Sequence, residues 1–308
     1  ATSYAATVGG GRWNRARGEF SVVAGGGGYN SPDSNWAPGD YSSVGGGRAN
    51  GASGQESTVG GGSFNTASAL QGTVSGGYAG LANGESATVG GGWHNTASGS
   101  VATVAGGQEN TASGTYSTVG GGWNNSASTS CSVIPGGCNN LILGDYSIAM
   151  GSGARALHNG AFVWADAAID ELESTADNQI MMLGSGGTWI YSNLDLLSGV
   201  TIHPGASAWA TYSDRNLKEN LTAVDGKEIL RKISSLSLNK WNFKSQSDNI
   251  KHIGPTAQDF YSTFGLGDDD KTISTIDPSG VALAGIQALL DKVEQLEARI
   301  AELEAERR

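Results

Sequence analysis

The sequence has little of what defines several common protein classes. Its 308 residues include only 2 cysteines, 6 prolines and 3 methionines. No apolar run approaches the roughly 18 residues that cross a bilayer, so we expect no membrane insertion by this chain. Charged residues make up 15% of the chain, which argues against a charge-driven disordered protein. For Cys131 and Cys138, one bridge, an inter-chain bond and two free thiols all remain open.

Lysine is absent from the first 211 residues, and its first occurrence lies in "YSDRNLKENL", residues 212–221. Residues 1–212 hold 5 arginines and 13 acidic residues, a net charge of −8. Residues 213–308 hold 13 basic and 16 acidic residues, a net charge of −3. No basic region is large enough to follow a nucleic-acid backbone, so no nucleic-acid partner is expected. The change in composition predicts a domain boundary near residue 213.

Patterns that bind metals or cofactors are weak. The glycine triplets lack the following helix and the GK[ST] of a phosphate-binding loop. "GDDDK" at 267–271 lacks EF-hand spacing and indicates a solvated turn. The histidines show no metal-ligand spacing. They are His94, His158, His203 and His252. We therefore expect no metal and no cofactor.

A repeat runs through the first half of the chain, clearest in "ATVGGGWHNTASGSV". Its aliphatic anchors recur every 15 residues, except for one step of 21 residues. They are Val8, Val23, Val44, Val59, Val74, Val89, Val104, Val119, Ile134 and Ala149. The long step places a six-residue insertion between Gly26 and Asn35. A fixed short period of this kind predicts a β-solenoid, and the asparagine of each unit suits a turn or a side-chain ladder.

The predicted core of this solenoid is thin, because each repeat buries about one valine and one alanine. Glycine loses much conformational freedom on ordering, so we expect stabilisation by association with identical chains. The period breaks near residue 158. Residues 159–212 predict a β connector that closes the roll, with Phe162 and Trp164 capping the core. The first residues already form a repeat unit, so we expect a piece of a longer chain.

Residues 1–158 resemble the left-handed parallel β-roll heads of trimeric autotransporter adhesins of the YadA type. The likeness rests on the small-residue anchor, the glycine turns and the near-constant period. It implies a mostly β, left-handed roll and a homotrimer. Those adhesins end in a membrane-anchoring barrel, which this sequence does not show.

Residues 213–278 have the composition of an α+β domain. "DGKEILRKISSL" predicts an amphipathic helix with apolar side chains inward. These are Ile229, Leu230, Ile233 and Leu236. "LNKWNFK" predicts a strand, and a second helix is expected from Thr256 to Phe264, stopped by Gly265.

Residues 279–308 predict a coiled coil. Apolar residues step by 3 and 4, which defines a and d positions. They are Ile286, Leu289, Val293, Leu296, Ile300 and Leu303. Oppositely charged g and e′ positions, Lys292 with Glu297 and Arg299 with Glu304, suit parallel chains. β-Branched a residues with leucine at d favour a dimer, whereas the β-roll resemblance implies a trimer, which we adopt.

Ser213 and Lys218 are a candidate nucleophile and base. The serine hydroxyl would attack a carbonyl, and a neutral lysine would take its proton. Lysine needs burial or a neighbouring cation to act as a base near neutral pH. The spacing of five is not that of one helix face, so spacing alone favours two ordinary surface residues.

The order of motifs along the chain favours the interpretation of Ser213 and Lys218 as nucleophile and base. "SDRNLKENL", "LSLNKWNF", "HIGPTAQDF" and "ISTIDPSGVALAGIQAL", followed by a coiled coil, resemble the intramolecular-chaperone autoprocessing domain of phage tail spikes and endosialidases. The resemblance covers residues 213–295. It implies that the domain trimerises, templates the upstream β-fibre and then cuts itself off. Ser213 is then the nucleophile, Lys218 the base, and Tyr212–Ser213 the cleaved bond.

Other residues enter through the same resemblance. His252 matches a histidine needed for processing, which either orients the site or holds the fold. Asp214 and Asn216 are expected to position the loop.

The sequence as a whole indicates a homotrimeric fibre or adhesin segment whose enzymatic act is one self-cleavage per chain. It is expected outside the cell, on a bacterial surface or a phage virion, with a host-surface or glycan ligand of unknown identity. An uncut trimer with a permanent trimerisation domain is the alternative. A carbohydrate-active enzyme is a third, but Asp166, Asp170 and Glu171 lie in no predicted cleft.

Overall fold

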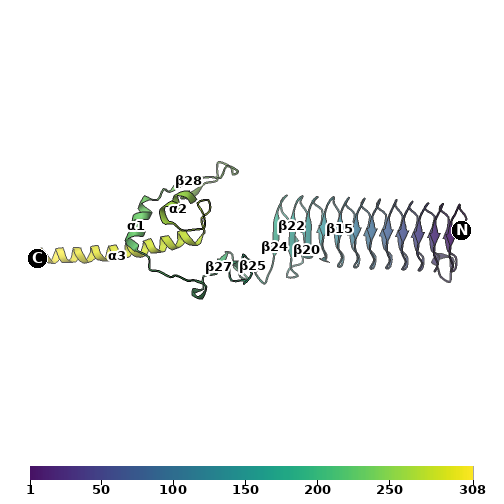
Figure 1. The fold of residues 1–308 in the computed structure, drawn as a ribbon, viewed down its shortest axis with the longest axis horizontal. Helices are drawn as coiled ribbons and strands as arrows, with labels where there is room; N and C mark the ends of the chain where they lie inside the picture. The colour runs from purple at the N-terminus through teal and green to yellow at the C-terminus, as the bar shows by residue number, and fades with distance from the viewer. Residues whose placement is uncertain (308) are drawn as a thin grey trace. The chain divides into compact units, whose positions relative to one another are not determined.

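The computed structural model describes residues 1–307 and divides the chain into two compact units, Ala1–Tyr212 and Ser213–Arg308 (Figure 1). The division falls between Tyr212 and Ser213, where the lysine-free part of the sequence gives way to ordinary composition.

The first unit is a parallel β-solenoid whose short strands stack coil upon coil (Figure 1). Within the described residues, one sheet runs through β1, β3, β5, β7, β9, β11, β13, β15, β17, β20, β22 and β24, with β18 beside β20. The bounds are β1 Thr7–Val8, β3 Val22–Val23, β5 Ser43–Val44, β7 Thr58–Val59, β9 Thr73–Val74, β11 Thr88–Val89, β13 Thr103–Val104, β15 Thr118–Val119, β17 Val133–Ile134, β18 Gly137–Cys138, β20 Ile148–Ser152, β22 Phe162–Ala165 and β24 Ile180–Leu183.

A second parallel sheet takes the alternate strands of each coil. Its members are β2 Arg15–Ala16, β4 Trp36–Ala37, β6 Gly51–Ala52, β8 Thr66–Ala67, β10 Leu81–Ala82, β12 Thr96–Ala97, β14 Thr111–Ala112, β16 Ser126–Ala127, β19 Leu141–Ile142, β21 Ala154–Ala156 and β23 Leu172–Glu173. The turn η1 (Ser31–Asp33) lies within the expected insertion.

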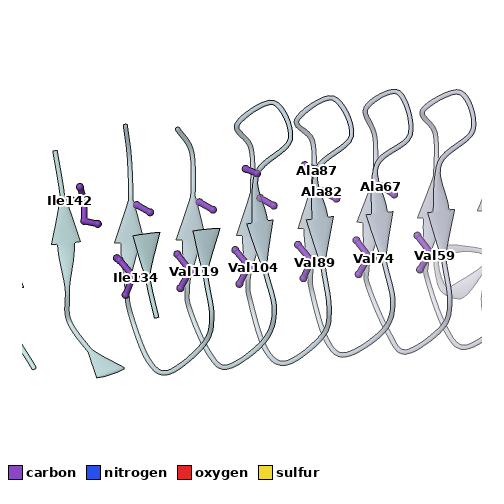
Figure 2. Packing of buried hydrophobic residues seen from close by; sticks show 14 of the residues in the cluster. Val59, Ala67, Val74, Ala82, Ala87, Val89, Val104, Val119, Ile134 and Ile142 are labelled. Atoms are coloured by element: carbon purple, nitrogen blue, oxygen red, sulfur yellow. The ribbon is translucent and has the colours of Figure 1, made fainter. Parts of the chain in front are cut away.

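The core is a column of valines facing a column of alanines (Figure 2). In-register pairs such as Val89 with Val104 and Ala97 with Ala112 lie 15 positions apart, and Val23 pairs with Val44 across the insertion. All of these side chains are fully buried or nearly so. Because strand side chains alternate between faces, a single residue enters the core in most of the described two-residue strands.

A ladder of buried asparagines satisfies backbone groups inside the solenoid. Asn110 Nδ2 donates to the carbonyl oxygens of Gly106 at 3.0 Å and Gly122 at 2.9 Å. Asn110 N donates to Asn95 Oδ1 at 2.9 Å, and Asn125 N donates to Asn110 Oδ1 at 3.0 Å. The asparagines therefore link successive coils, as a buried polar group must find partners.

The solenoid continues past residue 158, where the sequence placed its end. β22 pairs with β20 and β24, and Val163 and Ala165 continue the buried core. Phe162 and Trp164 point to the opposite face and do not cap the core. The alternation of side chains along the strand decides this, because it turns the smaller residues inward. An antiparallel sheet follows, of β25 (Thr188–Tyr191), β26 (Gly199–Ile202) and β27 (Ala210–Thr211).

The second unit is α+β. Its elements are η2 Arg215–Leu217, α1 Gly226–Ser235, β28 Asn239–Trp241, β29 His252–Gly254, α2 Ala257–Phe264 and α3 Ile276–Glu306. Helix α1 packs on α3, where Gly285 lacks a side chain and Ile233 Cδ1 fills the space. Of the four apolar residues predicted to face inward on α1, none is fully buried in the single chain. α2 ends at Gly265, which adopts a left-handed conformation (φ +66°) suited to glycine.

Helix α3 begins three residues before the expected coiled coil, because Pro278 fits the first turn of a helix, where its missing N–H is not needed. Among residues 1–307, no helix is both long and apolar enough to span a membrane.

Candidate functional site

Ser213 and Lys218 lie in direct contact at the start of the second unit. Lys218 Nζ is 2.7 Å from Ser213 Oγ. The turn η2 between them brings the two side chains together, although their spacing fits no single helix face. The backbone N–H of Leu217 donates to Asp214 O, and that of Lys218 donates to Arg215 O, both at 3.2 Å.

Asp214 caps this turn. Its Oδ1 accepts the backbone N–H of Asn216 at 2.8 Å and the Asn216 Nδ2 at 3.0 Å. Aspartate is among the residues that most often form this local bond, since its short side chain reaches the backbone two residues on. The carboxylate and the amide thus hold the loop that carries the serine and the lysine.

The Ser213–Lys218 pair is exposed in the single chain. The lysine donates to the hydroxyl in the observed geometry. Attack by the serine requires the opposite direction, in which a neutral amine accepts the hydroxyl proton. Burial disfavours the charged amine, so covering this pair would move it toward the form that can act as a base.

Tyr212, the residue before Ser213, is held by the first unit. Its hydroxyl donates to the Tyr191 hydroxyl at 3.5 Å, and the two rings stack with centroids 6.3 Å apart. The bond with Tyr191 raises the pKa of Tyr212 above its usual value, and a smaller desolvation adds to this. Tyr191 lies 21 residues away on β25, and no sequence pattern pointed to it.

His252 lies in the β28–β29 hairpin. Its Nε2 is 3.0 Å from Gln246 Oε1, and its ring packs on Trp241 and Phe243 with centroids 4.8 Å and 5.9 Å apart. None of the contacts described for His252 involves Ser213 or Lys218. Of the two roles left open for this histidine, the contacts favour holding the hairpin.

The predicted seam residues of α3 are between 43% and 63% exposed in the single chain. They are Ile286, Leu289, Val293, Leu296, Ile300 and Leu303. An apolar groove of about 360 Å³ between α1, α2 and α3 includes Leu230, Phe260, Ile286 and Leu289 in its wall. The seam and the groove thus share residues and form one apolar surface.

The remaining candidates do not form a site. A hydrogen bond from the Ser185 side chain, followed by the backbone N–H groups of Ser185 and Ala168, lowers the pKa of Asp166. Glu171 pairs with Arg155. The contacts of Asp166 and Glu171 thus hold a turn and a strand. Within residues 1–307 no group of three or more potential ligands could hold a metal.

Two other sequence features keep local roles. Cys131 and Cys138 are free and exposed, so no bridge joins them within the chain. Asp269, in the acidic turn, accepts the backbone N–H groups of Lys271 and Thr272, which lower its pKa. That carboxylate serves the turn itself.

The fold and the geometry define a class of protein: a parallel β-solenoid joined to an α+β domain that begins with a serine–lysine contact. Comparison with protein families gives the same division. Residues 213–265 match the model of the peptidase family S74, described as the chaperone of endosialidase. No curated protein matched the chain. Within the C-terminal unit, residues 213–265 are therefore similar to a chaperone domain, and this matched region begins at the residue where the unit begins.

Proposed function

We propose that the chain is a segment of an extracellular homotrimeric fibre or adhesin, borne by a bacterial surface or a phage virion. Its C-terminal unit drives trimer assembly and then cleaves the Tyr212–Ser213 bond. The family match to a chaperone domain supports the assembly role. The thin valine and alanine core of the solenoid supports the need for it, because non-local strand pairing with little burial is slow to form.

The observation that carries the cleavage is the 2.7 Å contact between Lys218 Nζ and Ser213 Oγ. It lies at the boundary between the two compact units. A cut at this point separates the solenoid from the chaperone without breaking either one.

The chemistry follows from the two side chains. Neutral Lys218 takes the proton of the Ser213 hydroxyl, and Oγ attacks the carbonyl carbon of Tyr212. The bond from that carbon to the Ser213 nitrogen breaks as the nitrogen gains a proton, leaving an ester between Tyr212 and Oγ. Water then hydrolyses the ester, which gives a carboxylate at Tyr212 and a free amine at Ser213.

We link trimer assembly to this chemistry through burial of the Ser213–Lys218 pair. The serine–lysine contact already exists in the single chain, so assembly is not needed to create it. Both side chains are exposed there, however. If trimer assembly covers this pair, burial favours the neutral amine that can act as the base. Loss of the chaperone then leaves the fibre kinetically hard to take apart.

Intact mass measurement of the wild-type chain beside Ser213→Ala, Lys218→Met and the matched control Ser237→Ala tests the proposal. We expect two fragments from the wild type and the control, divided at Tyr212–Ser213, and one whole chain from the other two variants. N-terminal sequencing of the smaller fragment should begin at Ser213. Whole chains from all four proteins, assembled as trimers, would instead establish the permanent trimerisation domain.

A further inference from the structure

Two departures from the repeat lie near the start of the solenoid. The six-residue insertion lies there, between Gly26 and Asn35. Four of the five arginines of residues 1–212 fall between residues 12 and 48, in a unit whose net charge is negative. In repeat proteins, insertions within single repeats form loops on one face, which is often the binding face. The repeat itself explains none of these residues.

The insertion borders a pocket of about 290 Å³. The wall of this pocket includes Arg15 of β2 and Arg17, which directly follows that strand. Trp36 and Pro38 enter it from the next coil. Ser31 of the insertion closes another side. The volume lies near the lower end of the roughly 300–1,000 Å³ of small-molecule sites, a size suited to a short ligand.

Trp36 is accommodated by a glycine in the neighbouring coil. Gly51 pairs with Trp36 in the sheet, and a Cβ at Gly51 would lie 2.3 Å from the indole Nε1. Later coils carry side chains at this register, such as Thr66 and Thr96. Gly51 therefore lets the indole lie against the backbone while 43% of Trp36 stays exposed. An exposed aromatic face held in this way suits stacking on a flat apolar surface.

The guanidinium groups of Arg15 and Arg17 are available to bind an anion. Arg15 Nη2 donates to Ser31 Oγ at 3.0 Å, and neither Arg15 nor Arg17 forms an ion pair within residues 1–307. Asp33, the acidic residue of the insertion, forms an ion pair with Arg48, in which Arg48 Nε lies 3.1 Å from Asp33 Oδ1. Guanidinium groups bind carboxylate and sulfate oxygens through paired N–H donors.

The insertion is fixed rather than loosely attached. Asp33 N donates to Asn30 O, and Ala49 N donates to Asp33 O, both at 3.0 Å. Gly28 gives room for the Asp33 side chain, because a Cβ there would lie 2.2 Å from Asp33 Cβ. A wall held in place before binding lowers the entropic cost of binding.

We propose that this pocket binds an anionic saccharide. Trp36 stacks on the apolar face of a sugar ring, and Arg15 and Arg17 bind its carboxylate or sulfate group. The pocket belongs to the solenoid unit and does not involve Ser213 or Lys218, so it stands whether or not the chain cuts itself.

Isothermal titration of the full chain tests this site. Trigalacturonate, a hyaluronan tetrasaccharide and 3′-sialyllactose present carboxylates, 3′-sulfolactose presents a sulfate, and lactose is the neutral reference. We expect at least one anionic saccharide to bind and lactose not to bind. Comparison of the carboxylated and sulfated probes identifies the anionic group. Binding should weaken as salt rises, since the arginines are exposed.

Arg15→Ala and Arg17→Ala should each weaken binding about tenfold or more, because each removes charged hydrogen bonds. Trp36→Ala should abolish stacking. Arg12→Ala, which removes an exposed arginine outside the pocket wall, is the matched control and should bind as the wild type does. Equal thermal unfolding midpoints of the arginine variants show that the fold is kept.

Three results would overturn the proposal. One is no binding of any anionic saccharide. Another is equal loss of binding in Arg12→Ala and Arg15→Ala, which indicates unspecific charge attraction. The third is binding of tetraglutamate as tight as that of the best saccharide, which indicates an acidic peptide ligand.

Discussion

The hydroxyl groups of Tyr212 and Tyr191 lie 3.5 Å apart, and their rings stack at an angle of 26°. This contact fixes the residue on the N-terminal side of the proposed cut to strand β25. The carbonyl that Ser213 would attack therefore belongs to a residue anchored in the first unit, while the nucleophile belongs to the second.

Tyr191→Phe tests that contact through its effect on Tyr212. The Tyr191 hydroxyl raises the pKa of Tyr212, so its removal should lower that pKa toward the ordinary value for tyrosine, about 10. Alkaline titration followed by ¹³C NMR of labelled tyrosines, with Tyr212→Phe for assignment, measures the change. A pKa of Tyr212 unchanged by Tyr191→Phe would contradict the contact.

The sign of the pH dependence follows from the same shift. A pKa raised in the folded state means that the contact contributes its full stability below the unfolded pKa of tyrosine, about 10. That contribution is lost as the pH rises through the folded pKa. The amide protection factors of the β25–β27 sheet, which are corrected for intrinsic base-catalysed exchange, should fall above this range in the wild type and change less in Tyr191→Phe.

His252→Phe separates the two roles of this histidine. Phenylalanine keeps the packing on Trp241 and Phe243 but cannot bond with Gln246 or move a proton. If His252 holds the hairpin, cleavage should persist in this variant, with a stability loss of about 1 kcal/mol from the missing hydrogen bond. His252→Ala, which also removes the packing, should lose more stability. Intact mass and thermal unfolding together decide, and a fully folded, uncut His252→Phe chain would assign the histidine to the site.

Leu296→Asp probes the seam of α3. Leu296 is exposed in the single chain, so the substitution should leave the fold of that chain intact. In a trimer it removes three buried leucines, about 5–9 kcal/mol of association free energy in total. Light scattering with size-exclusion chromatography should show single chains. Ala298→Asp adds the same charge on the opposite face of the helix and should still associate. Equal association of both variants would place the interface elsewhere.

Gly106 and Gly107 form a matched pair within one coil. A Cβ on Gly107 would lie 2.3 Å from Gly122 O, and its φ of +88° disfavours other residues, whereas a Cβ on Gly106 meets nothing within 4 Å. We expect Gly107→Ala to destabilise the solenoid by about 3 kcal/mol or more and Gly106→Ala to change stability by less than about 1 kcal/mol. Thermal unfolding monitored by circular dichroism measures both. Equal effects would contradict the stacking of backbone on backbone at Gly107.

The solenoid shows how far a repeat can be predicted. The anchor valines, the insertion and the asparagines were all found from the sequence, because each coil repeats the same local environment. The end of the solenoid was not predicted correctly, because β22 and β24 keep the parallel pairing after the period changes. Ala149 pairs with Val163, 14 residues on, and Val163 pairs with Met181, 18 residues on. Pairing between strands needs matching backbones, and it does not require a constant period.

In the second unit, the sequence predicted both short helices and the β28 strand from capping residues and periodicity. It also selected Ser213 and Lys218, but through resemblance, because their spacing alone was uninformative. The turn η2 that joins them depends on the Asp214 cap, a local hydrogen bond that the sequence motif predicts only in part.

The sequence by itself determined the repeat, the change of domain at residue 213 and the apolar seam of the last helix, because these depend on periodicity and composition along the chain. Only the tertiary structure decided which residues distant in the sequence contact one another. It placed Tyr191 against Tyr212, turned Phe162 and Trp164 away from the core, and brought Arg15, Arg17 and Trp36 to one pocket. Contacts between residues distant in sequence arise from strand stacking and loop geometry, which no local pattern encodes.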